Sequence, residues 1–177
     1  PLETQPPPPA EAELLSASWV VRELSELSEL SELSELSFRL SLPTSETATA
    51  TLSSVAAAEL AWVLTCETVG ILDLIERGEL EWQETPPPAR LHDIAERYAA
   101  AYQTVTSRLK HADDDAWLNP VQFKMGGEVA WEAPLGEMLW GFLFDAIHHR
   151  GQLSTYLRPM GGKVPSIYGP SADDPGQ

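Results

Sequence analysis

The chain has 177 residues, of which 43% are hydrophobic and 21% charged, a composition typical of one folded domain rather than a disordered chain. Its 27 acidic and 11 basic residues give a formal net charge of -16, which argues against a nucleic-acid partner because the phosphates would be repelled. The single cysteine, Cys66, excludes an internal disulfide and predicts a reducing, cytoplasmic location. We recognise no signal peptide and expect no membrane-spanning segment.

The first quarter of the chain combines a proline-rich tail with a triplet repeat. Residues 1–9 predict an extended tail, and residues 10–177 predict a single helical domain. From Ala10 to Pro43 no Gly or Pro interrupts the helical pattern, so one long helix is expected.

The triplet repeat, "SELSELSELSELS", begins at Ser25 and places one leucine every three residues. Each step of three turns an α-helix by about 300°, so the leucine stripe drifts by about 60° per triplet. The leucines from Leu24 to Leu36 therefore cannot all face one core. We expect some of them to be buried in a symmetric homodimer.

Three more helices and a hairpin are predicted after this repeat. Residues 41–51 are rich in Ser and Thr and predict a connection, after which Ser53 or Ser54 would cap the second helix. Gly78 is a typical helix stop. The fold class is therefore all-α, a four-helix bundle with a short hairpin-like insertion before the last helix. The expected elements are helices at 54–78, 91–111 and 134–158, a hairpin or ordered loop at 121–131, and an irregular tail after Pro159.

Candidate chemistry is concentrated in the last helix. Asp145 and His149 are four residues apart and so share one face, a spacing suited to a divalent metal ion held between facing helices. The alternative is a buried, hydrogen-bonded Asp–His pair without metal. His148 lies about 100° round the helix axis. Elsewhere, tryptophans could line an apolar pocket or belong to the core: Trp62, Trp131 and Trp140.

Two segments resemble a known family. "IHHRGQLSTYLRPMGGKVPSIYGPSADD" looks like the C-terminal signature of the DinB-like superfamily of bacterial four-helix bundles, and "AAAELAWVLTCETVGILDLIERGELEW" resembles its second helix. The resemblance implies an up-down-down-up bundle, often dimeric, in which three histidines hold Zn, Ni or a similar ion. It also implies a relation to S-transferases and isomerases that use a low-molecular-weight thiol such as bacillithiol, mycothiol or glutathione.

The family's three-histidine pattern is only partly present. His149 matches the last histidine, and Asp145 stands where the first histidine of the helical pair is expected. The histidine of the second helix is expected directly after "ELAW", where this chain has Val63, which cannot bind a metal.

Neighbouring side chains could replace the missing ligand. Glu67 lies one turn beyond Val63, and Cys66 lies three residues beyond it; thiolate and imidazole together would favour zinc. Each has an alternative: Glu67 could face solvent or pair with Arg150, and Cys66 could be a small core residue. His148 could be a spare ligand.

The sequence thus predicts a metal-dependent enzyme acting on a small molecule, a thiol S-transferase or a hydrolase. Its metal ligands would come from Asp145, His149, Glu67, Cys66 and His148, with Zn or Ni as the ion. Arg150 could pair with an acidic group or hold an anionic thiol cofactor. The rival interpretation is a metal-free bundle that has lost the reaction and serves as a binding or assembly module.

Overall fold

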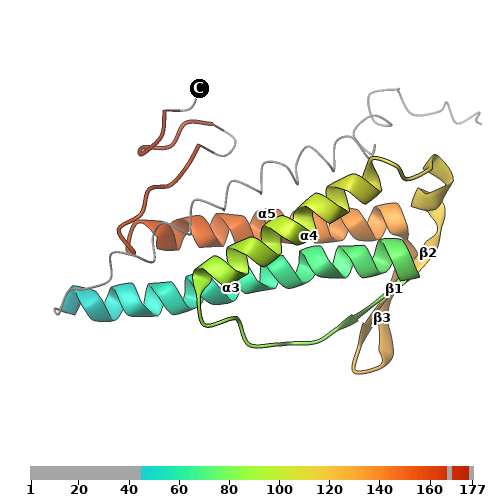
Figure 1. Cartoon of the computed structure of the whole chain (residues 1–177), viewed down its shortest axis with the longest axis horizontal. Helices are drawn as coiled ribbons and strands as arrows, with labels where there is room; N and C mark the ends of the chain where they lie inside the picture. Colours follow the sequence, from blue (N-terminus) through green and yellow to red (C-terminus); the bar gives the residue numbers. More distant parts are fainter. Residues whose placement is uncertain (1–44, 167–168, 176–177) are drawn as a thin grey trace, which may run out of the picture.

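The computed structural model describes residues 45–166 and 169–175, which form three long helices and a small sheet (Figure 1). The predicted proline-rich tail, first helix and triplet repeat lie outside the described residues. The described part is mostly helical, but its sheet corrects the expectation of an all-α fold. The elements are α3 (Ser45–Arg77), β1 (Glu79–Trp82), α4 (Leu91–Leu109), a short 3-10 helix (Asp114–Leu118), β2 (Pro120–Met125), β3 (Glu128–Pro134) and α5 (Leu135–Leu157).

Helix α3 begins earlier than the sequence predicts. The expected connection at 41–51 is helical from Ser45 onward, so neither Ser53 nor Ser54 is the first cap. No Gly or Pro occurs between Pro43 and Gly70, and a helix that has started extends at little cost through such a stretch. The predicted end is confirmed: Gly78 has φ 73°, and its N–H donates to the carbonyl oxygen of Leu74 at 3.1 Å.

The helices pack on α3, which lies against both α4 and α5. Helices α3 and α4 run in the same direction, and α5 runs back against them (Figure 1). An extended segment after β1 makes this parallel arrangement possible by returning along α3 to the start of α4. Buried apolar side chains from all three helices form the core, among them Leu64, Leu74, Ile94, Val105, Leu109, Met138, Leu139, Leu143 and Leu153.

The sheet lies at the end of the helices where α3 stops and α5 begins (Figure 1). The predicted hairpin is confirmed as β2 and β3, joined by Gly126 and Gly127, both with positive φ. Strand β1 was not predicted; it pairs in parallel with β2 and follows α3 directly. It approaches α3 closely because Gly70 has no side chain: a Cβ there would lie 2.7 Å from Cδ2 of Leu80.

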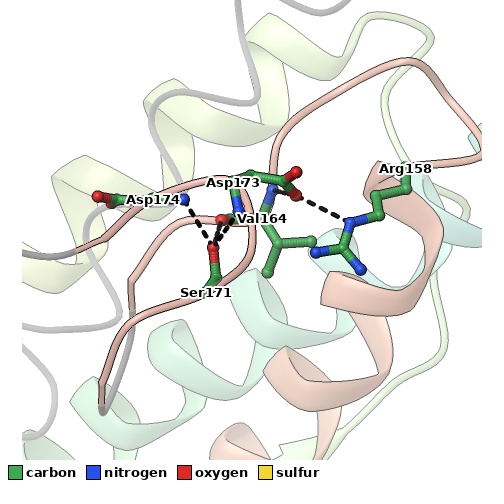
Figure 2. A network of polar contacts seen from close by, with 5 residues as sticks. All are labelled: Arg158, Val164, Ser171, Asp173 and Asp174. Atoms are coloured by element: carbon green, nitrogen blue, oxygen red, sulfur yellow. Dashed lines mark hydrogen bonds and ion pairs between the residues drawn. The ribbon is translucent and has the colours of Figure 1, made fainter.

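The C-terminal tail is irregular, as predicted, but it is held by side-chain hydrogen bonds (Figure 2). The carboxylate of Asp173 accepts from Nε of Arg158 at 2.8 Å and from the N–H of Val164 at 3.0 Å. The hydroxyl of Ser171 accepts from the N–H groups of Asp173 and Asp174 at 3.1 and 3.0 Å. The tail is therefore fastened to the last turn of α5.

One segment of α3 differs from the expectation that no part of the chain is apolar enough to span a membrane. Val55–Arg77 is long and apolar enough to cross a bilayer, by length and composition alone, and no other helix in the described ranges is. Within the fold, 44% of this apolar window is buried, and α3 packs against α4 and α5 as a core helix does. The segment is therefore weak evidence for a membrane span.

Candidate metal centre

Three metal-ligating side chains from two helices meet between α3 and α5, one of them buried, one half-buried and one exposed. Glu67 projects from α3, and Asp145 and His149 project from α5. Nε2 of His149 lies 3.7 Å from Oε1 of Glu67 and 3.6 Å from Oδ1 of Asp145. One donor atom from each residue lies within 4.8 Å of the other two. We call Glu67, Asp145 and His149 the acidic–histidine cluster.

Glu67 is the buried member of this cluster. Only 4% of the residue is exposed, and its Oε2 has no hydrogen-bond partner in the structure. Burial raises the pKa of Glu67 to about 9, and the adjacent Asp145 carboxyl contributes in the same direction. Burying a carboxylate is costly, so burial at this position favours a bound proton or a positive ion beside the carboxyl group.

Gln152 orients the histidine of the cluster. Nδ1 of His149 lies 3.0 Å from Oε1 of Gln152, and an amide oxygen can only accept a hydrogen bond. In this contact Nδ1 is the donor, and Nε2 faces the two carboxyl groups. Holding the second ring nitrogen in this way is the usual means of fixing a metal-binding histidine. Sequence analysis missed Gln152, although its place three residues after His149 puts it on the same face of α5.

The cluster fits a divalent ion by the chemistry of its donors. Two carboxyl groups and an imidazole nitrogen converge, yet the 3.6 and 3.7 Å separations of Nε2 of His149 from the two carboxyl groups are too long for hydrogen bonds. Tetrahedral ligands about 2.1 Å from a zinc ion would lie roughly 3.4 Å apart, close to what is observed. Asp145 has 55% of its side chain exposed, so one side of the cluster is open.

Cys66 lies apart from the cluster. With Val63 it lines a groove between α3 and the extended segment after β1, and the indole of Trp62 fixes that segment by donating to the carbonyl oxygen of Thr85 at 2.9 Å. Burial raises the pKa of the Cys66 thiol, with a smaller opposing contribution from a hydrogen bond to Thr85. The thiol therefore stays protonated at neutral pH and is a weak ligand there.

The other two predicted residues also lie outside the cluster. His148 is exposed and touches the cluster only through its neighbour, with ring centroids of His148 and His149 5.5 Å apart. Arg150 is only 3% exposed and points into the core. Burial raises the pKa of Tyr98, and the positive charge of Arg150 partly opposes this rise. Neither His148 nor Arg150 belongs to the metal-ligating group found among the described residues.

An apolar cavity of about 460 Å³ adjoins the cluster at Asp145. It is bounded by the β2–β3 hairpin on one side and by α5 on the other. Of the predicted tryptophans, Trp131 lines this cavity and Trp62 lines the groove on the far side of α3. The lining residues are Phe123, Trp131, Gly141, Phe142, Phe144 and Asp145.

Fold and site together define a helical protein with a candidate metal centre between two antiparallel helices. The model of the DinB family matches residues 18–176, nearly the whole chain, so the chain belongs to the DinB family. This confirms the family resemblance of the two sequence segments.

One curated relative shows how far the similarity extends. The chain is 28% identical over 92 residues to a protein described as "Uncharacterized protein YrdA" from Bacillus subtilis (strain 168). The match covers 52% of this chain and 53% of the relative, so the chain spans about half the length of that protein. Comparison with solved structures finds no significant match.

Proposed function

We propose that this chain is a metal-dependent enzyme that acts on a small molecule, with Glu67, Asp145 and His149 as its metal ligands. The observation that carries the proposal is the convergence of three acceptor atoms around a buried carboxyl group that has an unpartnered oxygen. Membership of the DinB family supports it. Zn or Ni is the proposed ion, because imidazole suits both and carboxylates bind them readily.

The bound ion would supply Lewis acidity, by which a thiol or a water becomes a nucleophile at neutral pH. The chain's own residues do the positioning. Gln152 keeps Nε2 of His149 free to act as a ligand, and Glu67 places a carboxyl group away from water. Asp145 belongs to the cluster and also lines the apolar cavity, so a reactant held in the cavity lies next to the cluster.

We extend the proposal to the reaction class, the fourth helix, the oligomeric state and the location of the protein. The reaction class is transfer to the sulfur of a low-molecular-weight thiol, or hydrolysis, as the family relation suggests. A helix from the first quarter of the chain would complete the bundle as its fourth member. The drifting leucine repeat supports a homodimer that buries part of that repeat. The single cysteine supports a cytoplasmic location.

The two adjacent histidines offer a matched test of the ligand set. His149→Ala should weaken metal affinity by about tenfold or more, because a ligand is lost, whereas His148→Ala should leave it unchanged. The measurement is a competition titration of Zn²⁺ against a chromophoric chelator, with both variants beside the wild type. Urea unfolding of metal-free His149→Ala should show little loss of stability.

A different result would favour the metal-free pair. If His149 only stabilises a buried carboxyl group, His149→Ala should cost roughly 1–3 kcal/mol in chelator and change no metal affinity. Equal Zn²⁺ affinities for the His148 and His149 variants would contradict the proposed ligand set.

A further inference from the structure

The cavity beside the cluster is built almost entirely from aromatic side chains and glycine. Phe123 and Trp131 come from the hairpin, and Phe142 and Phe144 come from α5. The volume of about 460 Å³ lies within the range of small-molecule sites, which is about 300–1,000 Å³. Trp131 and Phe144 remain 37% and 61% exposed, so aromatic surface is open to an incoming molecule.

Among the described residues that line the cavity, Asp145 is the only one with a charged side chain. Lys124, the residue after Phe123 on β2, is engaged elsewhere, since its Nζ lies 2.5 Å from Oε2 of Glu79. Arg150 is buried in the core and does not line the cavity. An anionic ligand would therefore enter an apolar space beside the negative charge of Asp145, and the described lining residues include no cation to offset the ligand's loss of hydration.

A glycine sets the shape of this space. A Cβ at position 141 would lie 2.6 Å from Cη2 of Trp131, so only glycine allows the indole to pack this close to the backbone of α5. Gly151, nearly three turns along the same helix, has no atom within 4 Å of its own hypothetical Cβ. The two glycines thus form a matched pair, one against the cavity wall and one away from it.

We propose that this cavity binds an apolar substrate, neutral or cationic and of aromatic-ring size, and presents it to the acidic–histidine cluster at Asp145. The inference rests on the proposed function for its link to the metal, and it assigns to the cavity the electrophile rather than an anionic thiol. The aromatic walls supply contact area, and in the metal-free protein the carboxylate of Asp145 supplies the preference in charge.

Three probes that share one ring system can test this: naphthylmethanol, naphthylmethylamine and naphthoate, which are neutral, cationic and anionic. Their affinities are measured by isothermal titration in chelator, so that the result does not depend on metal. We expect the alcohol and the amine to bind at least about tenfold more tightly than the carboxylate. Asp145→Asn should reduce the advantage of the amine over the alcohol without abolishing binding of the alcohol.

Variants locate the binding in the cavity. Gly141→Ala should reduce the affinity for the alcohol by about tenfold, since the indole of Trp131 must then move into the cavity. Gly151→Ala should leave this affinity unchanged. Phe144→Ala removes an exposed part of the cavity wall. It should reduce the affinity for the alcohol without destabilising the fold. The proposal is overturned if naphthoate binds as well as the alcohol, if no probe binds, or if Gly141→Ala and Phe144→Ala both bind like the wild type.

Zn²⁺ titrations of the same samples separate this inference from the proposed function. A chain that binds Zn²⁺ but shows no preference among the probes contradicts the cavity assignment alone. A chain that binds the alcohol in the cavity but no metal contradicts the proposed function alone.

Discussion

Glu67→Gln should abolish tight metal binding and leave the metal-free protein folded. Glu67 is the buried ligand of the cluster, and in the absence of metal burial keeps its carboxyl group protonated. Glutamine matches the protonated acid in shape but cannot become an anion. In a site removed from water, loss of that charge should reduce Zn²⁺ affinity by at least roughly a hundredfold.

Competition titration of Zn²⁺, with circular dichroism to check the fold, measures this effect. Glu59→Gln is the matched control, because it is the same substitution two turns earlier on α3, at an exposed position that lines the groove beside Cys66. It should bind Zn²⁺ like the wild type. A Glu67→Gln variant that keeps wild-type affinity would remove Glu67 from the site.

The stability of the metal-free protein should fall as the pH rises. The pKa of Glu67 is raised in the folded state to about 9, against an ordinary value of 4.5. Between these values the folded state holds a proton that the unfolded state has released, so the contribution of Glu67 is complete below about pH 4.5 and is lost as the pH rises through about 9. The free energy of unfolding should drop by up to roughly 1 kcal/mol per pH unit over this interval.

Urea unfolding in chelator at pH 5.5, 7 and 8.5 gives the comparison, with Glu67→Gln beside the wild type. All other titrating groups are shared, so the difference between the two curves isolates Glu67. The variant should gain stability relative to the wild type as the pH rises. Parallel curves would show that Glu67 is not held protonated by burial.

Elements fixed by local chemistry could be predicted from the sequence. Gly78 ends α3, and the two glycines of the hairpin adopt the positive φ that their turn requires. Helix α5 occupies Leu135–Leu157, as its apolar pattern between two prolines indicates. Strand β1 could not be predicted, because four residues pair in parallel with a strand some forty residues away. The start of α3 was placed late because Ser and Thr favour turns as readily as helices.

Of the predicted metal-ligating residues, Glu67, Asp145 and His149 lie together in the structure, and their role as ligands stays a prediction. The spacing of Asp145 and His149 indicated a shared helical face, and Glu67 followed from its position one turn beyond Val63. The sequence offered Glu67 first and Cys66 second as a replacement ligand, because both lie near the same turn of α3. Packing buries Glu67 against α5 and turns Cys66 toward the groove. The aromatic cavity depends on tertiary contacts between the hairpin and α5 that no spacing rule reveals. Gln152, by contrast, lies three residues after His149 on the same helix, so its place beside the histidine does follow from helical spacing.

The metal content of the untagged protein tests whether the acidic–histidine cluster holds an ion. The protein is purified without a nickel column and analysed by inductively coupled plasma mass spectrometry before and after reconstitution. The account predicts close to one equivalent of a divalent transition metal per chain after reconstitution, lost on prolonged chelation and recovered on adding Zn²⁺ or Ni²⁺. Less than about a tenth of an equivalent of every transition metal, even after reconstitution, would contradict it, since three converging ligands should retain their ion.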